Sequence, residues 1–255
     1  MMSKPRAKRW KRFVYLPDPH GHHVHRPSWE VVKQFIQDYL PDRVIYGGDV
    51  FDLSPIRRGA SAEEKAQSMQ PDFDAGMDLF HDVRPTDFVQ GNHDYRAWAV
   101  AKNDPGPIGD FCRHLVQQIE AWAKAENVAL YPYRANVFCP VGSRLKAMHG
   151  NIAQMHSAYS MAQMYGCVLF GHIHRQEYAR ARALDVREAW SCGCLSEIYQ
   201  PYNETGTAVL RHAHGFAFGE YDTQSDLYAV YMASEMEDGR WLIPTATKLY
   251  GKAKR

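Results

Sequence analysis

At 255 residues with 45% hydrophobic side chains, the chain is long enough to bury a large core, and one large α/β domain is favoured over two small ones. Its formal net charge of +1 excludes the strongly basic overall surface that attracts nucleic acid or membranes. Five cysteines are an odd number and too few for a disulfide scaffold, which indicates a reducing compartment. No signal peptide is visible, and no apolar run approaches the ~20 residues of a membrane span. We therefore expect a soluble, cytoplasmic protein without a membrane partner, while the oligomeric state stays open.

Basic residues crowd both ends of the chain. Six lie between Lys4 and Arg12, and four lie between Lys248 and Arg255. Solvated tails are favoured over contacts with a phosphate backbone. We expect residues 1–11 to be a disordered basic tail, residues 12–246 to form a single domain, and residues 247–255 to be a second basic tail.

Five apolar, strand-like runs each lead into polar side chains of the kinds that bind metals. The runs cover residues 12–16, 43–46, 87–90, 144–148 and 167–170, and the stretches that follow are Asp18-Pro19-His20, Gly47-Gly48-Asp49-Val50-Phe51-Asp52, Gly91-Asn92-His93-Asp94, His149-Gly150 and Gly171-His172-Ile173-His174. Glycine allows the backbone to turn sharply as it leaves a strand. Carboxylates, amides and imidazoles are oxygen and nitrogen metal ligands, and α/β proteins build their sites at strand ends. The sequence therefore predicts a metal site at these strand ends.

Helical patterns alternate with the first strands, which is typical of βαβ units. Ser28 is the expected N-cap of a helix over residues 29–40, and Pro41 should end it. A second helix is expected over about 62–83, with Pro71 and Gly76 as points where it can split. Its carboxylates are interpreted as a solvated face; they are Asp72, Asp74 and Asp78.

The second half of the chain reads mainly as strands. Residues 130–149 are expected to form a hairpin, and further helices are expected over about 111–125 and 152–165. Later strands are expected at 188–191, 215–221, 227–232 and 241–243. Cys192 and Cys194 have C-x-C spacing without a second pair, so a buried strand or turn is favoured over a metal site.

Taken in order, the polar stretches give D-x-H, G-D-x-x-D, G-N-H-D, H and G-H-x-H. This ordered set resembles the calcineurin-like metallophosphoesterase superfamily over about residues 12–175. The resemblance implies an α/β fold with four layers, in which two mixed β-sheets pack face to face and helices flank them. The strand-rich C-terminal third would belong to the second sheet.

The resemblance also implies two divalent metal ions. The first would be held by Asp18, His20, Asp49 and His174, and the second by Asp49, Asn92, His149 and His172. From the residues alone, two ions ~3.5–4 Å apart need a bridging carboxylate, and Asp49 is central in the motif order. A hydroxide shared by the ions would attack phosphorus in line. Mn²⁺ is the favoured ion, and Fe, Zn²⁺, Ni²⁺ and Mg²⁺ are compatible with mixed nitrogen and oxygen ligands.

His93 belongs to neither of these ligand sets and lies one position past Asn92. Its expected role is that of a general acid for the leaving oxygen, an effect typically worth ~10²–10⁴-fold in rate. Asp52 would orient His93, as its counterpart does in relatives. The residues expected to hold the substrate phosphate are Arg57, Arg58, Arg96 and His23.

Departures from the family pattern narrow the class of substrate that is expected. The serine/threonine protein phosphatases of this superfamily carry G-D-x-x-D-R-G and G-N-H-E, whereas here Leu53 and Ser54 follow Asp52 and the fourth motif residue is Asp94. The G-H-x-H ending looks more like the phosphodiesterases and repair nucleases. We expect a dinuclear metal-dependent phosphodiesterase, with DNA or RNA as a candidate substrate. The alternatives are a phosphomonoesterase for small phosphates and a non-catalytic scaffold, and the intact His93 argues against the scaffold.

Overall fold

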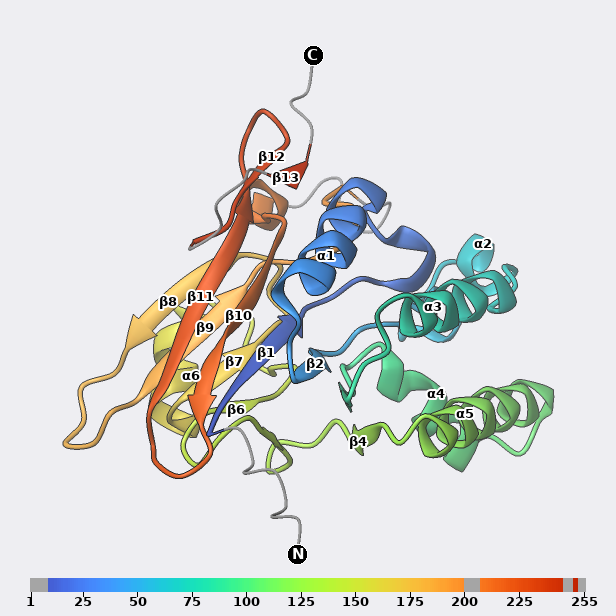
Figure 1. Ribbon diagram of the computed structural model, residues 1–255. Coiled ribbons are helices and arrows are strands. Elements are labelled where there is room, and N and C mark those ends of the chain that lie inside the picture. The colour runs from blue at the N-terminus through green and yellow to red at the C-terminus, as the bar shows by residue number, and fades with distance from the viewer. Residues whose placement is uncertain (1–8, 200–206, 245–249, 252–255) are drawn as a thin grey trace, which may run out of the picture.

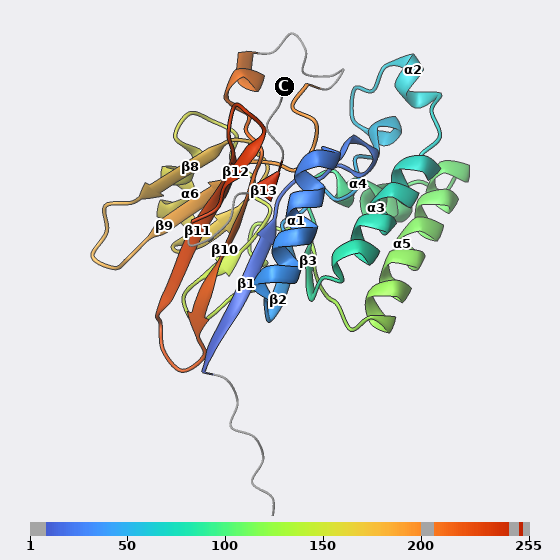
Figure 2. The same ribbon diagram turned by 45° about the horizontal axis from the view of Figure 1, so that its top comes forward.

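The computed structural model of the protein describes residues 9–199, 207–244 and 250–251. Two mixed β-sheets pack face to face, and helices cover their outer faces (Figures 1 and 2). This architecture confirms the predicted α/β fold of two mixed sheets flanked by helices. Among the helices of the described ranges, none has both the length and the apolar character that crossing a membrane requires.

The larger sheet contains eight strands, of which the first four along the chain run parallel to one another. These strands are β1 (Trp10–Leu16), β2 (Arg43–Tyr46), β3 (Asp87–Val89), β4 (Ala129–Tyr131), β10 (Gly215–Asp222), β11 (Tyr228–Glu235), β12 (Arg240–Leu242) and β13 (Tyr250–Gly251). Their order across the sheet is β13-β12-β11-β10-β1-β2-β3-β4. Strand β10 is antiparallel to β1, and the strands beyond it continue the antiparallel pairing.

The smaller sheet contains five strands in the order β5-β6-β7-β9-β8. They are β5 (Cys139–Pro140), β6 (Lys146–Ala147), β7 (Val168–Phe170), β8 (Gln176–Arg180) and β9 (Glu188–Cys192). Strands β6, β7 and β9 run parallel, whereas the two edge strands are antiparallel to their neighbours. Within each sheet, the parallel strands therefore have their carboxyl ends at the same edge.

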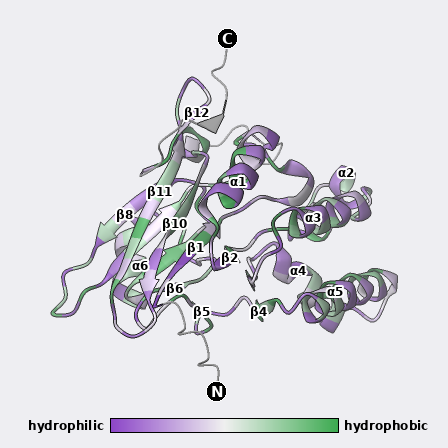
Figure 3. Cartoon of the chain, viewed as in Figure 1, coloured by the Kyte–Doolittle hydropathy of each residue, from purple (hydrophilic) through white to green (hydrophobic). Residues whose placement is uncertain are grey.

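Helices cover both outer faces of the pair of sheets (Figure 1). The α-helices are α1 (Arg26–Tyr39), α2 (Ala62–Lys65), α3 (Gln70–Val83), α4 (Asp94–Asn103), α5 (Pro107–Ala125) and α6 (Ser157–Tyr165), and the 3₁₀ turns are η1 (Gly21–His23), η2 (Ser54–Ile56) and η3 (Thr207–Arg211). Side chains of α1, α3 and α5 share a buried cluster with the larger sheet, whereas α6 packs on the smaller sheet. Figure 3 shows hydrophilic and hydrophobic residues alternating around α1, α3 and α5, as expected for helices that pack by one face.

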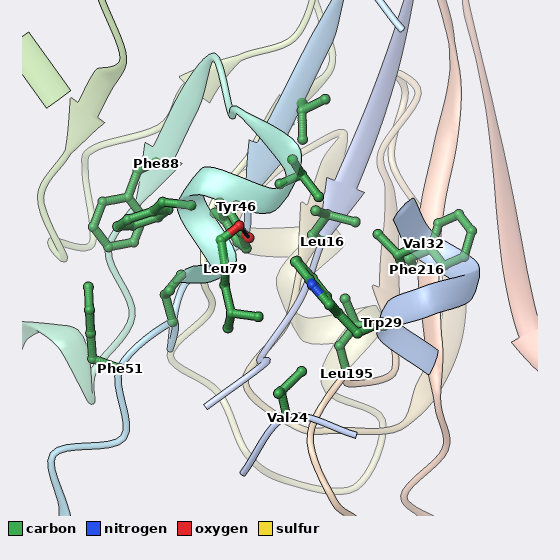
Figure 4. Close-up of a cluster of buried hydrophobic side chains, with 14 of the residues drawn as sticks. Leu16, Val24, Trp29, Val32, Tyr46, Phe51, Leu79, Phe88, Leu195 and Phe216 are labelled. Carbon is green, nitrogen blue, oxygen red and sulfur yellow. Dashed lines mark hydrogen bonds between the residues drawn. The ribbon is translucent and has the colours of Figure 1, made fainter. Parts of the chain in front are cut away.

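Strand β1 is buried on both faces because it lies between the two layers of side chains. Val14 and Leu16 belong to the cluster under the helices, whereas Phe13 and Tyr15 belong to the cluster between the sheets. Figure 4 shows Leu16 near Trp29 of α1 in the first cluster. A strand covered on both faces has a continuous apolar sequence, as this one does.

Two helix predictions change in detail. Helix α1 begins at Arg26, ahead of the predicted N-cap Ser28, and the Ser28 hydroxyl instead hydrogen-bonds Nδ1 of His25 at 2.7 Å. The segment 62–83 is split into α2 and α3 over residues 66–69. Pro71 lies in the first turn of α3, close to the break, whereas Gly76 lies inside α3 and does not interrupt it. A serine hydroxyl that has a side-chain partner nearby does not need to cap the helix.

The assignment of strands to sheets was partly wrong. Residues 130–149 do not form one hairpin, because β4 pairs with β3 in the larger sheet while β5 and β6 pair in the smaller one. The later strands β10, β11 and β12 belong to the larger sheet, and of the C-terminal third only β8 and β9 lie in the smaller sheet. Helix α4 lies in a segment where no helix was expected.

The ends of the chain can be compared with the expected tails only in part. Strand β1 begins at Trp10, two residues before the expected domain boundary, and Arg9 forms an ion pair with Asp222 at 2.7 Å. Strand β13 pairs with β12 within the stretch expected to be a C-terminal tail. Of the other basic residues near the two ends, Lys11 and Arg12 lie in β1. The rest lie outside the described residues; they are Lys4, Arg6, Lys8, Lys248, Lys252, Lys254 and Arg255.

Candidate metal centre

Five strand ends from both sheets meet at one place. The polar residues follow β1, β2 and β3 of the larger sheet and β6 and β7 of the smaller sheet. Backbone hydrogen bonds join neighbouring loops: the amide of His20 donates to the carbonyl of Asp49 at 2.9 Å, and the amide of Gly171 donates to that of His149 at 2.9 Å. The predicted convergence of the seven candidate ligands is therefore a property of the fold.

The first group of donors is Asp18, His20 and His174. The Nε2 atoms of His20 and His174 are 3.2 Å apart, and Nε2 of His174 is 3.7 Å from Oδ1 of Asp18. All three side chains are buried. Asp49 reaches this group through Oδ2, which is 3.8 Å from Nε2 of His20.

The second group of donors is Asn92, His149 and His172. The amide oxygen of Asn92 is 3.0 Å from Nε2 of His149 and 2.9 Å from Nδ1 of His172. Oδ2 of Asp49, the oxygen that faces His20, is also 3.2 Å from Nε2 of His149. One carboxylate oxygen thus faces both groups, which is the position that a bridging ligand needs.

Hydrogen bonds to residues outside the two groups orient imidazoles in both of them. Nδ1 of His20 lies 3.0 Å from Oδ1 of Asp52, and Nδ1 of His149 lies 2.9 Å from the carbonyl oxygen of Gly47. Because these partners accept hydrogen bonds, the Nδ1 atoms carry the protons and the Nε2 atoms keep their lone pairs for the centre. Oxygen and nitrogen lone pairs that face one another this closely repel unless a cation lies between them. The donor set therefore fits divalent metal ions.

Backbone strain is concentrated at the same residues. Five of the seven candidate ligands have positive φ angles, between 47° and 71°: Asp18, His20, Asp49, His172 and His174. Such angles are uncommon for residues other than glycine, and strain of this kind persists at functional sites because the surrounding structure holds it.

Two motif glycines leave room for the carboxylates. A Cβ on Gly91 would lie 2.0 Å from Oδ1 of Asp49, and one on Gly171 would lie 2.2 Å from Oδ2 of Asp18. The same Asp49 oxygen accepts the backbone amide of His93 at 2.8 Å, so Oδ1 holds the loop while Oδ2 faces the donors. The glycines of these motifs are thus required for close approach of the backbone.

The pKa shifts of the buried groups differ in direction: the pKa values of Asp18 and His149 are raised, whereas those of Asp49, His172 and His174 are lowered. Burial raises the pKa of Asp18 to about 8, and the charge of Asp49 adds to that rise while His149 opposes it. Burial lowers the pKa of His172 to about 4 and that of His174 well below its ordinary value, so both imidazoles are neutral, as metal ligands must be. A bound cation would favour the ionised form of such a carboxyl.

Asp52 holds two histidines with one oxygen. Its Oδ1 accepts hydrogen bonds from Nδ1 of His20 at 3.0 Å and from Nδ1 of His93 at 2.9 Å, and its Oδ2 accepts the hydroxyl of Ser54. Burial opposes ionisation of Asp52, but the two imidazoles outweigh it and keep the pKa well below the ordinary value. Burial likewise opposes the charged form of His93, yet Asp49 and Asp52 together raise its pKa. Nε2 of His93 is 3.8 Å from Oδ2 of Asp49.

Of the residues expected to hold a substrate phosphate, Arg57, Arg96 and His23 have partners within the protein. Arg57 is ion-paired with Glu64 of α2 at 2.7 Å, and Arg96 donates to the backbone carbonyl of Asp52 at 2.7 Å. Arg58 is exposed on the loop after η2. The ring of His23 packs against that of His22, with centroids 3.9 Å apart.

Two aspartates organise the site in ways the sequence did not indicate. Asp72, expected to be solvated, is only 3% exposed, and it accepts the amide of Leu53 at 2.8 Å and faces Nδ1 of His22 at 2.9 Å. Asp94 accepts the amides of Gly91 and Phe51, and burial, followed by the charge of Asp49, raises its pKa to about 7. The expectation of a solvated face held for Asp74 and Asp78, which are exposed.

Two aromatic residues beside the centre were also missed. The ring of Tyr133 lies against that of His149, with centroids 5.9 Å apart. The ring of His212 lies 5.1 Å from that of His174. Neither residue belongs to a strand-end motif, so no signal in the sequence could have placed them here. Cys192 and Cys194 are buried, as predicted, with Cys192 ending β9.

The chain has limited similarity to known proteins. No family model matches the chain. The Gene 54 protein of Mycobacterium phage D29 is 29% identical over 187 residues, which cover 65% of this chain and 70% of the relative.

Two solved structures are similar at low sequence identity. Vps29 of Chaetomium thermophilum is 12% identical with a TM-score of 0.44, covering 97% of this chain and 100% of its own. YfcE, a phosphoesterase from E. coli, is 13% identical with a TM-score of 0.40, covering 94% and 99%. Because both TM-scores are below 0.5, the functional conclusions rest on the motifs and the site. The chain resembles the calcineurin-like metallophosphoesterase superfamily in the order of its motifs, in its two-sheet architecture and in the convergence of the motif residues on one site.

Proposed function

We propose that the protein is a dinuclear metal-dependent phosphoesterase that hydrolyses phosphodiester bonds. One observation carries the proposal: Oδ2 of Asp49 faces two groups of metal-type donors, and the imidazole of His93 lies beside it without belonging to either group. This combination provides places for two ions and a separate proton donor. Divalent ions held by these residues would supply Lewis-acid polarisation of phosphoryl oxygens and an acidified water as nucleophile.

His93 is the residue proposed to deliver a proton to the leaving oxygen. Its Nδ1 is fixed by Asp52, so Nε2 is the atom that holds the transferable proton. The raised pKa increases the share of His93 that carries this proton near neutral pH. Asp52 stays ionised after the transfer and keeps the ring in place for the next proton.

The charge around the site supports a diester in preference to a monoester. A phosphomonoester carries up to two negative charges at neutral pH, whereas a diester carries one, so a monoester calls for more cationic contacts. One of the candidate arginines, Arg57, is already neutralised by its ion pair with Glu64 and therefore offers less positive charge to a substrate. The DNA or RNA backbone is a diester, and nucleic acid is therefore included in the proposed substrate class.

The test is a paired assay on metal-reconstituted protein. The full chain is stripped of metal, reloaded with Mn²⁺, and assayed with p-nitrophenyl phosphate and bis-p-nitrophenyl phosphate, which share one leaving group. We expect kcat/KM to be larger for the diester, and expect His93→Ala to reduce it while the exposed-surface control His114→Ala does not. Preference for the monoester would assign the protein as a phosphomonoesterase. Two bound ions without turnover of either compound would favour a scaffold.

A further inference from the structure

Two tyrosines form a pair beside the second group of donors. The ring of Tyr133 packs on His149, and the ring of Tyr95 lies next to that of Tyr133, with centroids 6.2 Å apart and planes tilted by 45°. Tyr95 is in the first turn of α4, and its side chain is 42% exposed. An exposed aromatic ring thus lies one ring away from a proposed metal ligand.

Both tyrosines are fixed to the loop that carries Asn92. The amide of Tyr95 donates to the carbonyl of Gly91 at 3.0 Å, and the amide of Tyr133 donates to Oε1 of the buried Gln90 at 3.3 Å. A second backbone bond, from the amide of Gln90 to the carbonyl of Tyr131 at 2.9 Å, joins the two segments. The backbones from which the two rings project are therefore held at a constant position relative to the centre, as a recognition surface requires.

We propose that the Tyr95–Tyr133 pair is a stacking platform for a nucleobase on the non-leaving side of the substrate. The inference rests on the proposed phosphodiesterase function and narrows its substrate class to nucleotide-containing diesters. Tyr133, packed against His149, would set the position of the pair, and the open face of Tyr95 would take the base. Stacking tolerates any base, because each base presents a flat π-face, so no base preference is expected.

The tilt between the rings favours one base on one face over insertion of a base between them. A sandwich would need parallel rings, whereas planes at 45° diverge. The other reading is that Tyr133 merely packs on His149 to orient the imidazole. In that case replacing Tyr133 would lower activity equally on every substrate, because the effect would be transmitted through the metal ligand alone.

The experiment compares two diesters that share the p-nitrophenyl leaving group, thymidine 5′-p-nitrophenyl phosphate and methyl p-nitrophenyl phosphate, on the Mn²⁺-loaded full chain. We expect the wild type to favour the thymidine ester in kcat/KM. Alanine substitution of a stacking aromatic typically costs ~1–3 kcal/mol per base, so Tyr95→Ala should reduce that preference by about 5-fold to about 150-fold. Activity on the methyl ester should stay unchanged.

Two further variants separate stacking from packing. Tyr133→Leu keeps apolar bulk against His149 and removes the ring, and it should also lower the thymidine preference. Tyr178→Ala, on the edge strand β8 and 50% exposed, is the matched control and should change neither rate. Calorimetric binding of thymidine 5′-monophosphate and methyl phosphate to the Mn²⁺-loaded protein gives a readout independent of turnover, with the nucleotide expected to bind more tightly only when Tyr95 is present.

The outcomes distinguish this inference from the function on which it rests. Equal rates on both diesters and equal binding of both monophosphates by the wild type would overturn the platform and leave the phosphodiesterase intact. Equal losses on both diesters in Tyr133→Leu, with Tyr95→Ala unchanged, would assign the pair to packing alone. Absence of turnover of both diesters by metal-loaded wild type would refute the proposed function, and the binding comparison would still decide on the platform.

Discussion

Replacing Asp52 with asparagine is expected to lower both the rate of hydrolysis and the affinity for one metal ion. The same oxygen, Oδ1, accepts hydrogen bonds from His20 and from His93 at 3.0 and 2.9 Å. Asparagine keeps the shape of the side chain and an amide oxygen that accepts hydrogen bonds, but it removes the charge, so the hydrogen bonds that orient both imidazoles weaken. One substitution therefore disturbs a proposed metal ligand and the proposed acid together.

The two effects have different expected sizes. Removing the outer partner of a metal-binding histidine typically costs 10–100-fold in metal affinity or activity, which is the loss expected at the ion held by His20. Misorienting a general acid forfeits up to its ~10²–10⁴-fold contribution, which is the loss of kcat expected through His93. At saturating metal the affinity defect is overcome, and only the loss through His93 remains.

The assay is a metal titration of kcat for Asp52→Asn, with bound metal measured by mass spectrometry. The control is Ser54→Ala, which removes a hydrogen bond to the other carboxylate oxygen and should have a smaller effect. If Asp52→Asn bound both ions as tightly as the wild type, Asp52 would not support His20. If kcat at saturating metal were also unchanged, the role given to His93 and Asp52 would be wrong.

Three further predictions concern the acid, the close approach of a glycine and the bound metal. His93→Ala should retain metal and lose rate, with a smaller loss for p-nitrophenol than for an alcohol leaving group; equal losses would contradict the acid role. Gly91→Ala should reduce metal content and stability, because its Cβ would lie 2.0 Å from Oδ1 of Asp49, and normal metal content in this variant would show that the loop can shift. Metal removal should lower the melting temperature: binding at 100-fold excess over Kd stabilises by ~2.7 kcal/mol, or roughly 5–10 °C, and an unchanged melting temperature would argue against a folded-state metal site.

The strand-end motifs could be predicted because each is local in sequence. A short apolar run, a glycine and polar residues such as Asn92 and His93 suffice to indicate a strand and its end. Parallel strands then bring their carboxyl ends together, so the convergence on Asp49 follows from topology. Burial of both faces of β1 likewise follows from its continuous apolar residues.

What could not be predicted depends on contacts between distant segments. Strand β10 resembles any buried strand in sequence, and its place beside β1 is set by pairing such as that of Phe13 with Gly219. Gly219 permits this position, because a Cβ there would meet the carbonyl oxygen of Ala229 at 1.9 Å. Sheet membership is thus decided by tertiary packing, about which local periodicity says nothing.

The roles of Asp72 and Tyr133 could not be predicted for a related reason. An aspartate among other acids on a helix looks solvated, and only the fold brings the amide of Leu53 to within 2.8 Å of it. Tyr133 follows β4, outside every motif, and reaches His149 because β4 pairs with β3. Positioning residues of this kind can be identified only from the structure, whereas the proposed ligands could be predicted from the sequence.

Counting the metal ions bound by Asp49→Asn tests the central claim most directly. Oδ2 of Asp49 faces both groups of donors, so loss of its charge should weaken both metal sites together. Plasma mass spectrometry of dialysed protein should give two ions per chain for the wild type and for the exposed control Asp78→Asn, and fewer at both sites for Asp49→Asn. Two tightly bound ions in Asp49→Asn would contradict the bridging role that the proposed centre assigns to Asp49.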